Sequence, residues 1–292
     1  MQISFQISTP IRHAVVLFAC ANLSFLIFSS SVDGAPYAST WVSGQKSSLR
    51  LIAADRISPQ GFYRAGLEIQ LDPGALTYWR MPGGAGVPPV FSFEGSANAA
   101  SIDVFYPAPM RIDEDGTEAF GYRDKVTFPI HVTPKDASRP VVLTVNLSYA
   151  VCLRLCLPSK AGVSLTLDPN QKASAASEEA SAVAAAEAAV PLRLTPQQRD
   201  TKVKINRDVT ALSPVWRLSP TTPAEDLFAE GPPGWYFETR KLVPDGFLIE
   251  AVEQPEAASR AGSKAPVPVT LTLKGAGESY EFGIDLETSS SN

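Results

Sequence analysis

The stretch Pro140–Asn170, PVVLTVNLSYAVCLRLCLPSKAGVSLTLDPN, places two of the three cysteines of the chain between two runs with a β pattern. The first run, 140–152, ends at Cys152, and the second, 162–170, follows soon after Cys156. Short apolar runs that end in turn residues predict strands. The two cysteines are therefore expected at a strand end or in a tight loop of a β-scaffold.

The residues upstream extend the same β pattern. The runs 48–57, SLRLIAADRI, and 62–74, FYRAGLEIQLDPG, alternate apolar and polar positions, and 126–134, VTFPIHVTP, is predicted to be another strand. Turn signals recur at 72–74, 82–84 and 115–116, and the 25 prolines of the chain favour β-structure with many turns. Regular short strands without helical patterns predict a β-sandwich.

The composition changes at residue 171. The segment 171–191, QKASAASEEASAVAAAEAAVP, favours helix by its alanine and glutamate but has no broad apolar stripe, so a solvated helix or a flexible linker is expected. Strand patterns return after it, and the turn VPDG at 243–246 between two apolar runs predicts a hairpin. The expected organisation is a first β domain at 37–169, a linker at 170–190, a smaller second β domain at 191–286 and a disordered tail at 287–292.

The first residues have the pattern of a secretory signal. Arg12 and His13 precede an apolar run from Ala14 to Phe28, and small residues follow it. The run is short for a membrane span, which needs about 20 residues, although an uncleaved anchor is the alternative. We expect residues 1–36 to be removed together with Cys20, and the mature protein to be exported to a compartment where disulfides can form.

The charge of the chain excludes one class of partner. Its 25 basic and 30 acidic residues give a net charge of −5, without a basic run or stripe. Nucleic-acid binding is therefore not expected.

Three functions compete for Cys152 and Cys156. A structural disulfide would stabilise little, because closing so short a loop contributes about 2 kcal/mol against about 4.7 for a 100-residue loop. A copper(I) site would suit two thiolates, but the available histidines are His13 in the signal and His131 in a predicted strand. A redox-active dithiol would use the short spacing to resolve a mixed disulfide, and Arg154 between the cysteines could favour a thiolate.

The blocks RIDEDGTEAFGYRDKVTFPIHV at 111–132 and LTVNLSYAVCLRLCLPS at 143–159 resemble the amino-terminal periplasmic domain of the disulfide reductase DsbD. The short cysteine spacing is most similar to the ScsB-like branch, as are LTYWRMPGGAGVPPVF at 76–91 and DLFAEGPPGWYF at 226–237. The resemblance covers most of the chain from Trp41 to Leu286. It implies an immunoglobulin-like β-sandwich followed by the second, smaller β domain.

The resemblance also implies a site and its surroundings. Cys152 and Cys156 would carry the exchange, and Cys152, nearer the chain start, would form the mixed disulfide. An acidic pair and an aromatic cap shield the dithiol in the family; Asp115 stands where DsbD has phenylalanine, so Phe120 is the expected cap. The other expected wall or neighbouring residues are Asp113, Glu114, Tyr122, Tyr78, Trp79, Arg154 and Pro158.

These patterns together predict a periplasmic thiol–disulfide interchange protein without cofactor or metal. Its expected partners are a membrane-embedded thiol transporter of the DsbD or CcdA type and periplasmic thioredoxin-like proteins. The alternatives are a non-enzymatic β-sandwich adaptor with a structural disulfide, and a copper(I)-binding protein.

Overall fold

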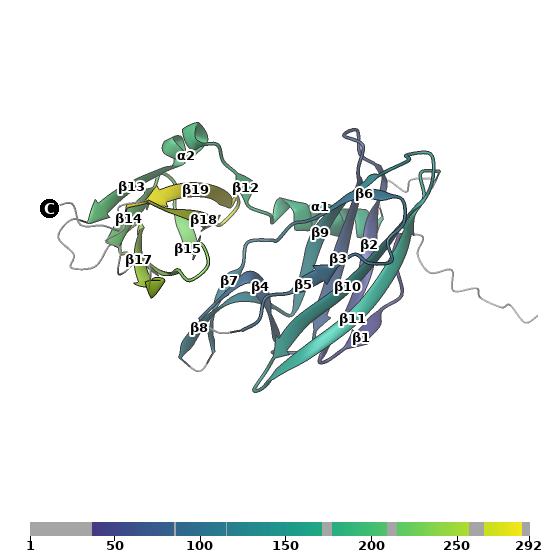
Figure 1. The fold of residues 1–292 in the computed structure, drawn as a ribbon, viewed down its shortest axis with the longest axis horizontal. Coiled ribbons are helices and arrows are strands. Elements are labelled where there is room, and N and C mark those ends of the chain that lie inside the picture. The colour runs from purple at the N-terminus through teal and green to yellow at the C-terminus, as the bar shows by residue number, and fades with distance from the viewer. Residues whose placement is uncertain are drawn as a thin grey trace, which may run out of the picture. The chain divides into compact units, whose positions relative to one another are not determined.

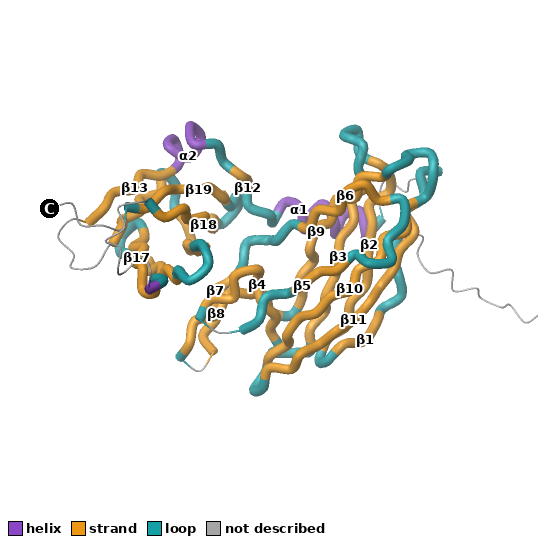
Figure 2. The backbone as a smooth tube through the Cα atoms, viewed as in Figure 1, coloured by secondary structure: helices purple, strands orange, loops and turns teal. Residues whose placement is uncertain are grey.

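The computed structural model describes residues 37–84, 86–114, 116–170, 177–208, 215–256 and 266–287. These residues form β-sheets with two short helices, and the strands pair antiparallel except for the parallel pair β12–β19, so the predicted all-β fold class is confirmed (Figures 1 and 2). In this part of the chain, none of the helices has the length and apolar character needed to cross a membrane. The predicted signal at 1–36, Asp115 and the tail at 288–292 lie outside the described residues.

The first sandwich holds the cysteines and consists of two sheets. One sheet has the order β1-β2-β3-β9-β6, with the bounds β1 Val42–Gly44, β2 Ser47–Ile57, β3 Tyr63–Leu71, β9 Lys125–Pro134 and β6 Ala99–Val104. The other has the order β11-β10-β4-β8-β7, with a short β5 also paired to β10; the bounds are β11 Cys156–Leu167, β10 Val141–Cys152, β4 Leu76–Gly83, β8 Thr117–Arg123, β7 Met110–Glu114 and β5 Val90–Ser92.

The core of this sandwich follows from the alternation of side chains along its strands. In β9 the core-facing residues are Val126, Phe128, Ile130 and Val132, and β10 contributes Val141, Leu143, Val145 and Leu147 from the opposite sheet. All of these side chains are buried. The strands predicted at 48–57, 62–74, 126–134 and 140–152 are therefore confirmed as β2, β3, β9 and β10.

The second sandwich also has two sheets around its own core. One sheet contains β12 Leu192–Arg193, β19 Tyr280–Leu286, β18 Val267–Gly275 and β15 Ala224–Glu230. The other contains β13 Val203–Asp208, β14 Val215–Pro220, β17 Phe247–Glu253 and β16 Tyr236–Lys241. The predicted VPDG hairpin is confirmed, because Lys241 pairs with Phe247 across this turn.

Helix α1, Glu178–Ala188, corrects the expectation of a solvated linker helix. Ser177 caps its first turn, and Val183 is fully buried against Ile52 and Ala54 of β2. Val183 and the buried Ala186 thus pack the helix on the outer face of the β1-β2-β3-β9-β6 sheet, although no broad apolar stripe exists.

Helix α2, Pro196–Lys202, lies in the region where only strands were expected. Thr195 caps it, and the side chain of Gln198 accepts a hydrogen bond from the Thr195 N–H. This reciprocal capping box with proline in the first turn is a local start signal. The all-strand prediction for 191–286 is therefore wrong at 196–202.

Strand β15 links the two cores. Leu227 and Ala229 face the second core, whereas Phe228 between them packs into the first. Its ring meets Phe120 edge-on at a centroid distance of 4.9 Å. Arg111 of β7 adds a bidentate ion pair with Asp226. Both sandwiches therefore share a well-packed contact through β15.

Candidate functional site

Cys152 and Cys156 form a disulfide with an S–S distance of 2.08 Å. They are directly opposite each other as the last register pair of the β10–β11 hairpin, and only Leu153, Arg154 and Leu155 connect them. The strand β11 begins at Cys156 itself, earlier than the pattern at 162–170 predicted. The disulfide therefore joins neighbouring strands that the backbone ladder already holds together.

The two sulfurs have unequal surroundings. Cys152 is 2% exposed and packs with Leu76, Ile112, Ala119 and Ala150, whereas Cys156 is exposed. Leu155 next to it is 76% exposed, and Arg154 is exposed as well. Cys156 is therefore the more accessible residue of the pair, and burial protects Cys152.

Tyr78 of β4 touches both sulfurs. Its hydroxyl lies 2.9 Å from Sγ of Cys152 and 3.3 Å from Sγ of Cys156. The backbone positions it, because β4 pairs with β10 at Cys152↔Leu76 and Val151↔Thr77. The tyrosine side chain is 1% exposed, so this contact is shielded from water.

Glu114, the last residue of β7, completes the cluster. The Tyr78 hydroxyl donates to its carboxylate, at 2.9 Å from Oε2 and 3.1 Å from Oε1. Burial, followed by the hydrogen bond and the negative charge of Glu114, raises the pKa of Tyr78 above its usual value. The phenol therefore stays protonated at neutral pH and can donate a hydrogen bond to the carboxylate or to a thiolate.

Glu114, Cys152 and Cys156 have their ligand atoms within 4.8 Å of one another. After reduction the cluster would offer two thiolates and one carboxylate, and copper(I) prefers soft sulfur ligands over carboxylate oxygen. His131 does not join them, because its Nε2 lies 2.9 Å from Glu187 and its ring stacks on Phe62. The described residues thus place no histidine in the cluster.

The other expected site residues lie at varying distances from the disulfide. Asp113 is exposed, and its carboxylate accepts a hydrogen bond from Gly116 N–H in the β7–β8 turn. Pro158 is exposed on β11, opposite Ala150 and two register pairs from the disulfide. Neither residue belongs to the cluster of Tyr78, Glu114 and the two sulfurs.

Three expected aromatic residues belong to the core of the first sandwich instead. Trp79 and Phe120 pack against Phe228, and the buried Tyr122 hydroxyl donates to the carbonyl of Pro107. Phe120 is 2% exposed within this core, so the structure does not place it as a cap over the disulfide. The apolar cover of Cys152 comes from Leu76, Ile112, Ala119 and Ala150, which the sequence analysis had not singled out. Residues two apart in a strand lie on the same face of the sheet. Leu76 could therefore have been predicted beside Tyr78, and Ile112 beside Glu114.

Comparisons with known proteins give three findings. Residues 49–168 match the family model described as "Thiol:disulfide interchange protein DsbD, N-terminal", and this range contains Tyr78, Glu114 and both cysteines. No curated protein sequence matches the chain.

Among solved structures, the fold is similar to the N-terminal periplasmic domain of ScsB from Proteus mirabilis, with a TM-score of 0.65 and 20% sequence identity. The similarity covers 87% of this chain and 100% of that one, so it extends over both sandwiches. At this identity it establishes the shared fold, and the expected immunoglobulin-like sandwich class is confirmed with it.

Proposed function

We propose that this protein is a thiol–disulfide interchange protein of the periplasm, from the match of residues 49–168 to the DsbD N-terminal family and the geometry of its disulfide. It would accept reducing equivalents from a membrane-embedded thiol transporter of the DsbD or CcdA type. It would pass them to thioredoxin-like or other thiol proteins. The observation that carries the proposal is the disulfide between one exposed and one buried cysteine residue in the same short hairpin.

The exchange begins when a donor thiolate attacks Sγ of Cys156, because Cys156 is the more exposed residue of the pair. The Cys152–Cys156 bond breaks, and Cys152 leaves as a thiolate to which the Tyr78 hydroxyl can donate. The second donor thiolate then attacks its own sulfur in the mixed disulfide and releases Cys156. The donor ends as a disulfide and the protein as a dithiol, so two electrons are transferred, and solvent supplies the two protons.

This assignment reverses the role expected from the family resemblance, in which Cys152 forms the mixed disulfide. With 2% exposure, Cys152 cannot be reached by a protein thiol without displacement of its apolar neighbours. Cys156 is therefore the proposed attacking residue and Cys152 the resolving one.

The proposal is tested with the variants Cys152→Ala and Cys156→Ala. Each is mixed with a single-cysteine thioredoxin-like protein activated as its thionitrobenzoate disulfide, and the release of thionitrobenzoate is followed. Cys152→Ala should release it rapidly and accumulate a mixed disulfide on a non-reducing gel. Cys156→Ala should react at least about tenfold more slowly, since the remaining thiol is buried. Equal reactivity would contradict the assignment of roles.

The alternatives predict different results in the same experiments. A structural disulfide in an adaptor would have a reduction potential below about −300 mV and would resist glutathione. A copper(I) site would give tight copper binding to the reduced protein that both variants lose. Either result without thiol exchange would overturn the interchange function.

A further inference from the structure

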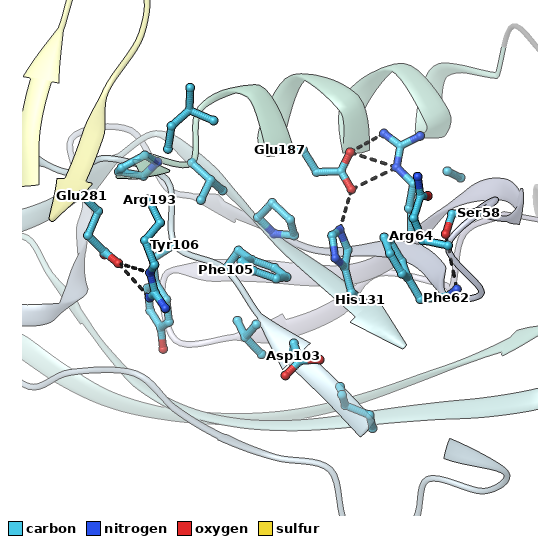
Figure 3. Close-up of a pocket in the computed structure, with 18 of the residues that line it drawn as sticks. Ser58, Phe62, Arg64, Asp103, Phe105, Tyr106, His131, Glu187, Arg193 and Glu281 are labelled. Carbon is cyan, nitrogen blue, oxygen red and sulfur yellow. Dashed lines mark hydrogen bonds and ion pairs between the residues drawn. The ribbon is translucent and has the colours of Figure 1, made fainter. Parts of the chain in front are cut away.

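A cleft of about 1460 Å³ lies away from the disulfide, on the outer face of the β1-β2-β3-β9-β6 sheet. Its walls include the end of α1, the segment 190–193 and the 57–60 turn, and its floor holds the rings of Phe62, Phe105 and His131 (Figure 3). Small-molecule sites commonly have about 300–1,000 Å³. The larger volume of this cleft suits a segment of polypeptide.

One side of the cleft is the edge strand β6. Five consecutive residues, 102–106, line the cleft, although side chains in a strand alternate between its two faces. The cleft therefore runs along the backbone of this edge. Among the described residues, strand β6 pairs only with β9, which leaves its other edge open there.

The register shows which backbone groups face that open edge. Phe105 N–H donates to the carbonyl of Pro129, so this is a hydrogen-bonded pair. Hydrogen-bonded and non-hydrogen-bonded pairs alternate in an antiparallel ladder, which makes Asp103↔His131 the next hydrogen-bonded pair. The N–H and C=O groups of Ile102 and Val104 consequently point away from β9, toward the cleft side.

These backbone groups have no hydrogen-bonding partner among the described residues. Natural edge strands are usually protected by lysine, proline or a covering loop. Strand β6 has the sequence AASIDV and contains neither lysine nor proline. The outward N–H and C=O groups of Ile102 and Val104 recur at every second residue. This is the spacing with which another extended chain would form hydrogen bonds.

The charges of the cleft specify one feature of that chain. Glu187 pairs with Arg64 and His131, and Glu281 pairs with Arg193. Asp103 is exposed and, within the described part of the chain, is the lining carboxylate that makes no ion pair or hydrogen bond. Opposite charges directly across two strands stabilise the pairing. A lysine or arginine is therefore the complementary residue opposite Asp103.

We propose that the β6 edge binds an extended segment of a partner protein as an added strand, with a basic residue opposite Asp103. Such strand addition takes affinity from main-chain hydrogen bonds and specificity from alternate side chains. A second copy of this chain fits less well, because antiparallel pairing of β6 centred on Asp103 would place two aspartates opposite each other. This inference does not depend on the disulfide exchange.

The test uses the full mature chain and the capped peptide Thr-Val-Thr-Val-Lys-Val-Thr-Val-Thr at up to millimolar concentration. Amide hydrogen exchange is measured by NMR. In the free protein the amides of Asp103 and Phe105 should be protected and those of Ile102 and Val104 should exchange. Added peptide should protect Ile102 and Val104. Absence of that protection at millimolar peptide would overturn the proposal.

A charge exchange then tests specificity without disturbing the core. The variant Asp103→Lys should bind the lysine peptide about fivefold more weakly and should prefer the peptide with glutamate in the central position. Glu94→Lys makes the same charge change at an exposed acid outside the cleft and should bind as the wild type does. Equal responses of the two variants would contradict the role of Asp103.

Val104→Pro removes one of the two outward N–H donors of β6 and should weaken peptide binding at least about tenfold, with circular dichroism checking that the variant is folded. Self-association of the wild type that this variant abolishes would instead identify a second copy as the occupant and overturn the proposal.

Discussion

At the scale of single residues, Glu114 sets the electrostatics of the disulfide. Its carboxylate is joined to both sulfurs through the Tyr78 hydroxyl. A negative charge close to a thiol disfavours the thiolate and raises the thiol pKa. Glu114 should therefore restrain the reactivity of the reduced dithiol, while the phenol offers the thiolate a hydrogen bond.

The variant Glu114→Gln removes this charge but keeps a similar shape. We expect a lower apparent pKa for the reduced dithiol and about threefold to tenfold faster alkylation by iodoacetamide at neutral pH. Asp113→Asn is the matched control, because Asp113 is exposed and lies outside the cluster. A rise in the thiol pKa of Glu114→Gln, or the same change in the control, would contradict this role.

The sequence could name the aromatic residues of this region but could not assign them to the site or the core. Tyr78 and Trp79 are neighbours in β4, so their side chains lie on opposite faces. Tyr78 reaches the sulfurs and Trp79 enters the core with Phe228. Which face carries the site depends on where β4 pairs with β10, and that pairing is a long-range property.

At the scale of elements, α1 is attached by Val183 and by a small network around Glu187. The carboxylate accepts from Nε of Arg64 at 2.9–3.0 Å and contacts His131. Burial alone would raise the pKa of Glu187, but hydrogen bonds and charges from Arg64 and His131 outweigh it and lower that pKa. The ionised carboxylate is therefore the form that holds the helix.

The pH dependence of α1 follows from this direction. A carboxylate with a lowered folded pKa adds stability above its unfolded value of about 4.5 and loses it as the pH falls through the folded pKa. Below pH 4.5 the protection of the α1 amides, measured against their intrinsic exchange rates at the same pH, should fall progressively, and Glu187→Gln should show reduced protection already at pH 7. The expected gain in rate is about fivefold, for a loss of about 1 kcal/mol.

Glu178→Gln is the control for this measurement, since Glu178 is exposed in the first turn of the same helix. It should leave exchange in the last turn of α1 unchanged. If Glu187→Gln behaves like Glu178→Gln, packing of Val183 alone holds the helix.

The element patterns differ in how well a sequence reveals them. Regular alternation predicted β2, β3, β9 and β10, because each strand buries one face in a core. The attachment of α1 could not be predicted in this way, because one valine among alanines gives almost no amphipathic signal. The surface against which Val183 packs is formed by Ile52 and Ala54, which lie far away in the sequence.

At the scale of the whole molecule, the second sandwich supports the strands that carry the site. Arg80 of β4 pairs with Glu230 and Glu281, and Arg111 of β7 pairs with Asp226. The same two strands carry Tyr78 and Glu114. The boundary predicted between 169 and 191 therefore separates the two sandwiches along the sequence. In the fold, residues of the second sandwich nevertheless pack against and pair with β4 and β7 of the first. No local pattern could predict this, because Phe228 looks like an ordinary strand residue.

Phe228→Ala tests this support. The ring is fully buried in the first core, so its removal should cost about 3–5 kcal/mol and raise hydrogen exchange in β4 and β8. Phe237→Ala is matched in chemistry and burial but lies in the second core. It should raise exchange in β14 and β17 first. Identical exchange maps for the two variants would contradict a shared contact through β15.

The disulfide closes the end of the β10–β11 ladder, so its reduction should change the backbone little. Because twelve register pairs hold the two strands together from Val141↔Leu167 to Cys152↔Cys156, opening the bond frees no length of chain. The bond closes so short a loop that it adds only about 2 kcal/mol. Oxidised and reduced forms should therefore have nearly the same backbone. In the proposed exchange, a partner would then distinguish the reduced from the oxidised form by the sulfur atoms and their local charge alone.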